Sequence, residues 1–138
     1  MPAPTGQLKR TSQAYDADAD FFTPRVTIAA TTATNAIEFD VIPQGAYKAQ
    51  VFNGAYTGYV AGTAEWSVEF QVANAAAGPW VTINSTPLNG ADGDTADISL
   101  SGKEVQQAVP DAAFARLNAV LTGAAGPLSY EASIVPCY

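Results

Sequence analysis

A strict alternation of apolar and polar residues is the feature that most constrains this chain. Between residues 66 and 72 the large apolar side chains occupy every second position, as Trp66, Val68, Phe70 and Val72. Because successive side chains of a β-strand point to opposite faces, this period predicts a strand with one buried face. The stretch 74–79 supplies turn residues, and 80–83 is again aromatic and β-branched. Residues 66–83 are therefore predicted to form an antiparallel hairpin.

The same alternation recurs along the rest of the chain. A second hairpin is predicted from residues 115–122 and 128–134, and shorter strands are expected at 26–28, 37–41, 47–51, 56–61 and 98–100. Asn53-Gly54 is typical of a tight hairpin turn. Residues 84–94 are expected to be loop, and 104–109 either a strand or one helical turn.

Eight to ten short strands separated by turn signals predict an all-β fold, an antiparallel β-sandwich that is either immunoglobulin-like or jelly-roll-like. Its order of strands is left open by the sequence. The expected interior residues are Trp66, Val68, Phe70, Val72, Leu117, Leu121, Tyr130 and Ile134.

Residues 1–24 show neither a strand period nor a helix period, and they are predicted to form an extended N-terminal arm. Residues 25–138 are predicted to form the β-sandwich domain with a short C-terminal tail. Ordering a backbone costs about 1–2 kcal/mol per residue, and the arm has few large apolar groups to offset that cost. We therefore expect it to pack on another chain. The expected partner-binding residues are Tyr15, Phe21, Phe22, Arg25, Cys137 and Tyr138.

The charge balance argues against two classes of partner. The formal net charge is −7, and the six basic residues are scattered, whereas phosphate binding needs clustered Lys and Arg. No stretch approaches the roughly 18 apolar residues of a membrane span, and the first residues lack the apolar region of a secretory signal. We expect no nucleic-acid partner, no membrane partner and synthesis in the host cytoplasm.

The scarcity of reactive side chains argues against an enzyme. The chain has no histidine, so imidazole-based metal sites and imidazole-activated nucleophiles are excluded. Its single cysteine, Cys137, allows neither an internal disulfide nor a cysteine cluster for zinc. Glu65 and Glu69 lie about 13 Å apart on one strand, too far to act together. We expect no catalytic residues and no cofactor.

Two acidic clusters were weighed as cation sites. The series Asp16, Asp18, Asp20 begins like a calcium loop, but Phe21 and Thr27 stand where that loop needs glycine and glutamate. A solvated linker explains it better. The carboxylates of Asp92, Asp94 and Asp97 can converge on one ion, although Asp-Gly is also common in plain turns. No metal site is predicted, and cation binding at residues 92–97 is left open.

The pattern of the two hairpins resembles that of head-decoration and cement proteins of tailed bacteriophages. The residues that carry the resemblance are "WSVEFQV", the turn with Gly78, "GPWVTI", and the closing hairpin "FARLNAVLTGAAGPLSYEAS". It covers roughly residues 37–135 at the level of pattern. The resemblance implies a β-sandwich on the outer surface of assembled capsids, often a trimer, whose arm ties neighbouring major capsid subunits together. It implies no catalytic residues.

The sequence therefore predicts a non-enzymatic virion structural protein, a capsid cement or decoration subunit. It would bind the major capsid protein on the outer surface of the virion and form a homo-oligomer, with a trimer implied by the resemblance. The alternative is a carbohydrate- or receptor-binding β-sandwich module of a phage tail. In that interpretation the aromatic residues and the loop at 92–97 form the site, whereas the cement interpretation places most aromatic residues in the core.

Overall fold

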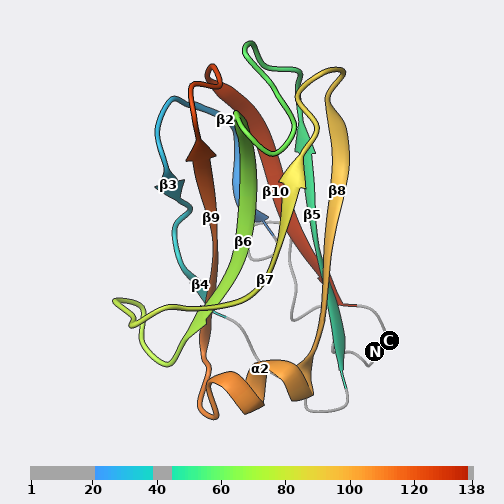
Figure 1. Ribbon diagram of the computed structural model, residues 1–138. Helices are drawn as coiled ribbons and strands as arrows, with labels where there is room; N and C mark the ends of the chain where they lie inside the picture. The colour runs from blue at the N-terminus through green and yellow to red at the C-terminus, as the bar shows by residue number, and fades with distance from the viewer. Residues whose placement is uncertain (1–20, 39–44, 137–138) are drawn as a thin grey trace.

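The computed structural model describes residues 21–38 and 45–136, which fold into two antiparallel β-sheets packed face to face (Figure 1). The β5 sheet has the spatial order β2 (Phe21–Ile28), β10 (Leu128–Pro136), β5 (Ala46–Asn53) and β8 (Asp94–Ser101). The β6 sheet has the order β3 (Thr32–Ala33) with β4 (Ile37–Glu38), then β9 (Phe114–Thr122), β6 (Glu65–Ala73) and β7 (Val81–Leu88). Within these residues the structure has one helix, α2 (Gly102–Ala108). The predicted all-β sandwich is confirmed.

The pairing of strands is nested, and it distinguishes the two predicted types of sandwich. Among the described residues, the first strand, β2, pairs with the last, β10, and the next two, β3 and β4, pair with the penultimate strand β9. The pattern continues inward, where β5 pairs with β8 and β6 with β7. A long hairpin rolled into two sheets has this pairing, and the fold is therefore a jelly roll.

Burial of the side chains follows the alternation in the sequence. Along β5, β9 and the first part of β6, buried positions alternate with more exposed ones, whereas the last four residues of β6 are all buried. Seven of the eight expected core residues are buried, and the eighth, Leu121, is partly buried against the same core. Trp66 is fully buried, and its indole Nε1 donates to the carbonyl of Gly126 at 2.8 Å, which satisfies the polar atom of this ring. The expected core is confirmed.

The sandwich begins earlier than the sequence predicts. Strand β2 starts at Phe21, within the stretch assigned to the arm, and its backbone pairs with β10 as far as Phe21 opposite Ser133. The register of this pair is irregular on either side of Ala132. The irregularity breaks the two-residue alternation by which a strand is recognised in the sequence. Pro24 is tolerated because β2 is an edge strand of its sheet. The ordered strand therefore shortens the possible arm to residues 1–20.

The connections from β5 to β6 and from β9 to β10 were predicted wrongly. Strands β9 and β10 do not form the predicted second hairpin, because they lie in different sheets, where β10 pairs with β2 and β5 and β9 pairs with β6. Asn53-Gly54 is not a tight hairpin turn, because β5 and β6 lie in different sheets and residues 54–64 cross between them. Residues 56–61 are not a strand, and the pairing there is limited to one isolated bridge between Val60 and Ala64.

Two further segments take a definite structure that the sequence left open or assigned differently. Residues 84–88, expected to be loop, complete strand β7, which tolerates Pro87 because it is the edge of its sheet. The ambiguous segment after residue 101 is helix α2. Ser101 accepts from the backbone N–H of Glu104 at 3.1 Å, and the Glu104 carboxylate accepts from the N–H of Ser101 at 3.0 Å. This capping box fixes the start of the helix.

The two ends of the sandwich differ in construction (Figure 1). We call the end formed by residues 29–31, 54–64, 89–93 and 123–127 the loop end. The opposite end, which we call the helix end, carries α2, the 74–80 loop, the start of β2 and the finish of β10. The strand directions place all four loop-end connections together, because neighbouring strands are antiparallel.

Candidate functional site

The predicted partner-binding residues fall partly outside the described part of the chain. Tyr15, Cys137 and Tyr138 are outside the described residues. Phe21 and Phe22 begin strand β2, where their backbone belongs to this chain's own sheet, and their side chains are not described. Their role in binding a partner stays a prediction.

Arg25 has acceptors within its own chain. Its Nη2 lies 3.1 Å from the Glu131 carboxylate, and its Nη1 donates to the carbonyl of Ser129 at 3.2 Å. Both side chains of the ion pair are well exposed, at 49% and 39%, so the pair contributes little to stability. Arg25 therefore does not require a partner's carboxylate, although it remains accessible to one.

The acidic stretch at residues 92–97 comprises the end of a turn and the start of strand β8, which begins at Asp94. Gly93 has a φ of 78°, and a Cβ atom there would lie 2.7 Å from the carbonyl of Asn53, so only glycine fits. The carboxylate of Asp97 lies 3.8 Å from the ammonium of Lys48, its neighbour on β5. Asp92 is exposed. Within the described part of the chain no group of three or more acidic or cysteine side chains is placed to hold a metal ion.

The loop end is held together by hydrogen bonds centred on Tyr56. Its hydroxyl donates to the carbonyl of Leu88 at 2.7 Å and accepts from the N–H of Trp66 at 3.0 Å. Asn53 donates to the carbonyl of Asn89 at 2.9 Å, and its buried Oδ1 has no hydrogen-bond partner. Burial raises the pKa of Tyr56 above its ordinary value, an effect that the hydrogen bond from Trp66 partly offsets.

Most aromatic residues weighed as a sugar-binding surface belong to the interior. Tyr47, Tyr56, Trp66 and Tyr130 are buried, which confirms the core interpretation for these four. Burial also raises the pKa of Tyr130. Trp80 is different, because it is half-buried and lies on the outer side of the β6 sheet next to Arg116.

Trp80 is the aromatic member of an ordered group on that outer side. The Arg116 guanidinium carbon lies 4.4 Å from the centre of the Trp80 ring, a cation–π distance. Arg116 Nε donates to Gln71 Oε1 at 2.7 Å, across the register that pairs β9 with β6. Gln71 is only 8% exposed, so its amide is fixed rather than mobile.

The hydrogen bonds continue along the sheet from Gln71. Its Nε2 donates to Thr82 Oγ1 at 3.1 Å and to Glu69 Oε1 at 3.3 Å. Glu69 Oε1 also accepts from Asn118 Nδ2 at 3.2 Å. We call this group the polar face; its residues are Glu69, Gln71, Trp80, Thr82, Arg116 and Asn118.

The polar face could not be predicted from the sequence because its members come from β6, β7, β9 and the residue that precedes β7. The polar phases of residues 66–72 and 115–122 are visible in the sequence, but nothing local sets Gln71 opposite Arg116 or Glu69 opposite Asn118. Only the register between β6 and β9 brings them together. The contact between Trp80 and Arg116 was likewise not predicted from the sequence.

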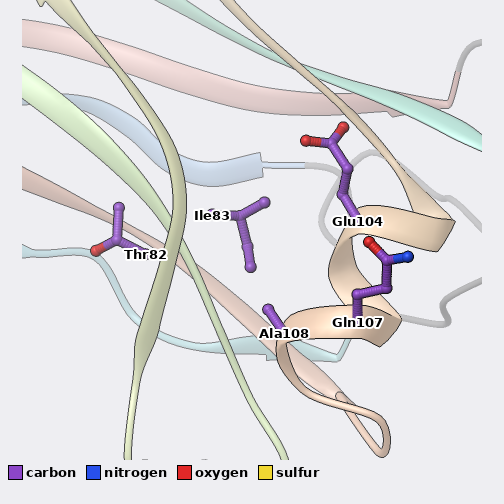
Figure 2. Close-up of a pocket in the computed structure, with 5 residues that line it drawn as sticks. All are labelled: Thr82, Ile83, Glu104, Gln107 and Ala108. Atoms are coloured by element: carbon purple, nitrogen blue, oxygen red, sulfur yellow. The ribbon is translucent and has the colours of Figure 1, made fainter.

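A shallow hollow beside the polar face separates β7 from α2 (Figure 2). It has a volume of about 380 Å³ and is lined by Thr82, Ile83, Glu104, Gln107 and Ala108. Glu104, its one ionisable side chain, is already engaged by the capping box of α2. The hollow therefore offers a ligand little specific chemistry beyond the amide of Gln107.

Two general findings complete the description of the chain: one concerns membrane-spanning helices and the other concerns related proteins. Among the described residues no helix is both long and apolar enough to cross a membrane. No protein-family model matches the chain, and no curated protein matches it in sequence.

Proposed function

We propose that this chain is a non-enzymatic structural protein of a virion, a capsid cement or decoration subunit that binds the assembled shell and clamps adjacent major capsid subunits. The observation that supports the proposal most is the position of the chain ends on the jelly roll. Strand β2 begins beside the last residues of β10, with Phe21 opposite Ser133. The first and last described residues, Phe21 and Pro136, therefore both lie at the helix end.

This arrangement suits a clamp. A rigid body whose terminal segments share one end can stand on a surface and send both segments into it. We place the shell at the helix end and the loop end toward solvent. The segment 1–20 is long enough to cross a neighbouring subunit, since an extended chain spans about 3.3 Å per residue.

The mechanism is mass action. A cement subunit that binds the assembled shell, and not the dissociated shell subunits, stabilises the assembly. The stabilising free energy grows with the ratio of the concentration of the cement subunit to its Kd for the shell. In this proposal residues 1–20 become ordered only when the subunit binds the shell. Ordering them costs free energy and lowers the affinity, so the contacts with the shell must contribute more than that cost. A homotrimer would set three such segments around one junction.

The test compares particles that carry the protein with particles that lack it. We expect complete particles to retain their genome at higher temperature and after osmotic shock, and cryo-electron microscopy to show the jelly roll on the shell with its helix end inward. Equal resistance of the two kinds of particle would contradict the clamp. Density for the protein at the tail would replace it with the second candidate.

A carbohydrate- or receptor-binding module of a tail is that second candidate. It is favoured by one observation, the accessible tryptophan and fixed polar side chains of the polar face. The two candidates place the protein differently on the particle, but they do not require different folds.

A further inference from the structure

We propose that the polar face binds a neutral carbohydrate, through stacking on Trp80 and hydrogen bonds to Glu69, Arg116 and Asn118. The face lies on the outer side of the β6 sheet, and its Trp80 belongs to the 74–80 loop of the helix end. The proposal deepens the second candidate function and rests on it, and the particle experiment and the sugar titration test the two separately. None of the residues of the polar face comes from the acidic stretch at residues 92–97, where the sequence leaves cation binding open.

The face presents both unused donors and unused acceptors. Arg116 uses Nε for Gln71 and spreads its guanidinium against Trp80, which leaves Nη1 and Nη2 without a protein acceptor among the described residues. Glu69 accepts both of its hydrogen bonds through Oε1, so Oε2 is available. Asn118 donates through Nδ2 and keeps Oδ1. A sugar hydroxyl both donates and accepts, and it can therefore use either kind of atom.

These side chains are held in place before any ligand arrives. Gln71 is 8% exposed and connects Arg116 on β9 with Thr82 on β7, while Asn118 fixes the carboxylate of Glu69. A ligand that binds here pays little to order them, which favours recognition of small, weakly held molecules. The rows Arg116–Gln71–Thr82 and Asn118–Glu69–Ser85 lie about 7 Å apart along the strands, which suits a short saccharide.

The chemistry of the face disfavours the other occupants. Its formal charges, one guanidinium and one carboxylate, cancel, and the whole chain carries −7, so an anionic polymer is repelled rather than attracted. A protein partner would be expected to find a larger apolar centre, because interface cores are depleted of charged residues. The polar face has one aromatic ring among five polar side chains. An aromatic ring beside planar polar groups complements the mixed apolar and hydroxylated surfaces of a sugar.

The experiment uses the fact that the chain has two tryptophans in opposite settings. Trp66 is fully buried with its indole N–H bound to Gly126, whereas Trp80 is accessible. The ¹⁵N-labelled full chain is titrated with methyl glycosides of glucose, galactose, N-acetylglucosamine and rhamnose, followed by short oligosaccharides of each. We expect at least one sugar to shift the Trp80 indole resonance saturably and to leave that of Trp66 unchanged.

Variants then assign the site. Trp80→Ala is expected to weaken binding at least about tenfold, and Trp80→Phe to retain part of it, since a smaller ring still stacks. Glu69→Gln is expected to weaken binding by a similar factor for the sugar whose hydroxyl donates to Oε2. Phe52→Ala, on the exposed outer side of the β5 sheet, is the matched control and should bind as the unaltered protein does. Unchanged Trp66 resonances in every variant establish that the fold is kept.

The proposal is overturned if no sugar of the set shifts the Trp80 resonance. It is also overturned if sugars bind equally well to Trp80→Ala. A Trp80 shift produced by the shell protein and by no sugar would assign the face to a protein interface and exclude the carbohydrate.

Discussion

At the scale of single residues, the loop end depends on close approaches that tolerate no added atom. The ring of Tyr56 is fixed by two hydrogen bonds, and the backbone of Gly90 lies directly against it. A Cβ atom at Gly90 would lie 2.5 Å from the Cζ atom of that ring. The glycine is required because the tyrosine cannot move without losing both bonds.

We expect Gly90→Ala to lower the free energy of unfolding by about 1–3 kcal/mol, the usual cost of overpacking an interior. Gly54→Ala is the matched control, because its nearest non-neighbouring atom is 4.0 Å from the added Cβ, and a change within about 0.5 kcal/mol is expected. Urea denaturation of the two variants provides the measurement. A stable Gly90→Ala protein would mean that the Tyr56 ring has room to shift.

The raised pKa of Tyr130 predicts a loss of stability in alkali. Burial holds the folded-state pKa above the ordinary value of about 10, so the unfolded chain releases the proton first as the pH rises. The free energy of unfolding should be insensitive to this group below about pH 10 and fall above it. Tyr56, whose pKa is also raised, contributes in the same direction.

Replacing Tyr130 with phenylalanine removes one of these two ionisations. The Tyr130→Phe variant is therefore expected to unfold at a higher pH than the unaltered protein, with a change within about 1 kcal/mol at neutral pH. Circular dichroism during an alkaline titration measures the midpoint. A midpoint that does not move would show that Tyr130 is not among the groups that drive alkaline unfolding.

At the scale of elements, the sequence predicted what is encoded locally and missed what is set by distant pairing. The hairpin of β6 and β7 was predicted correctly because a short turn follows the clearly alternating strand that contains Trp66. The second predicted hairpin was wrong, because alternation identifies β9 and β10 as strands but does not reveal that they join different sheets. The start of β2 was missed because a register irregularity opposite β10 breaks its period. The Asn53-Gly54 turn was misassigned because the dipeptide cannot reveal that the next strand joins the other sheet.

Helix α2 was left ambiguous although its signal is present, as the Ser101-x-x-Glu104 spacing of a capping box. At seven residues it is too short to be stable alone, so the cap and the contact of Val105 with the core both matter. We expect Ser101→Ala to lower the free energy of unfolding by about 0.5–2 kcal/mol. Ser99→Ala, an exposed serine of the same strand, should be nearly neutral when measured by the same denaturation experiment.

At the scale of the whole molecule, the buried core lies entirely within residues 45–136 of the described chain. Deleting residues 1–20 is therefore expected to leave the midpoint of unfolding unchanged, within about 0.5 kcal/mol, and to abolish binding to particles. Limited proteolysis provides the second measurement: residues 1–20 should be cut in the isolated protein and protected in the assembly. Equal protection in both states, or a destabilised deletion variant, would show that the segment packs on its own sandwich.

The nested pairing of strands has a consequence for how the protein is made. Arg25 on β2 contacts Ser129 on β10, 104 positions later, and β10 lies between β2 and β5. When the ribosome has synthesised β2 through β9, β10 is still missing, and β10 is the strand that connects β2 with β5 in the β5 sheet. Throughout most of translation the nascent chain therefore exposes unpaired strand edges and the apolar sides of both sheets. We expect its yield in a foreign host to respond to chaperone supply and to the speed of synthesis, even where the finished protein is stable.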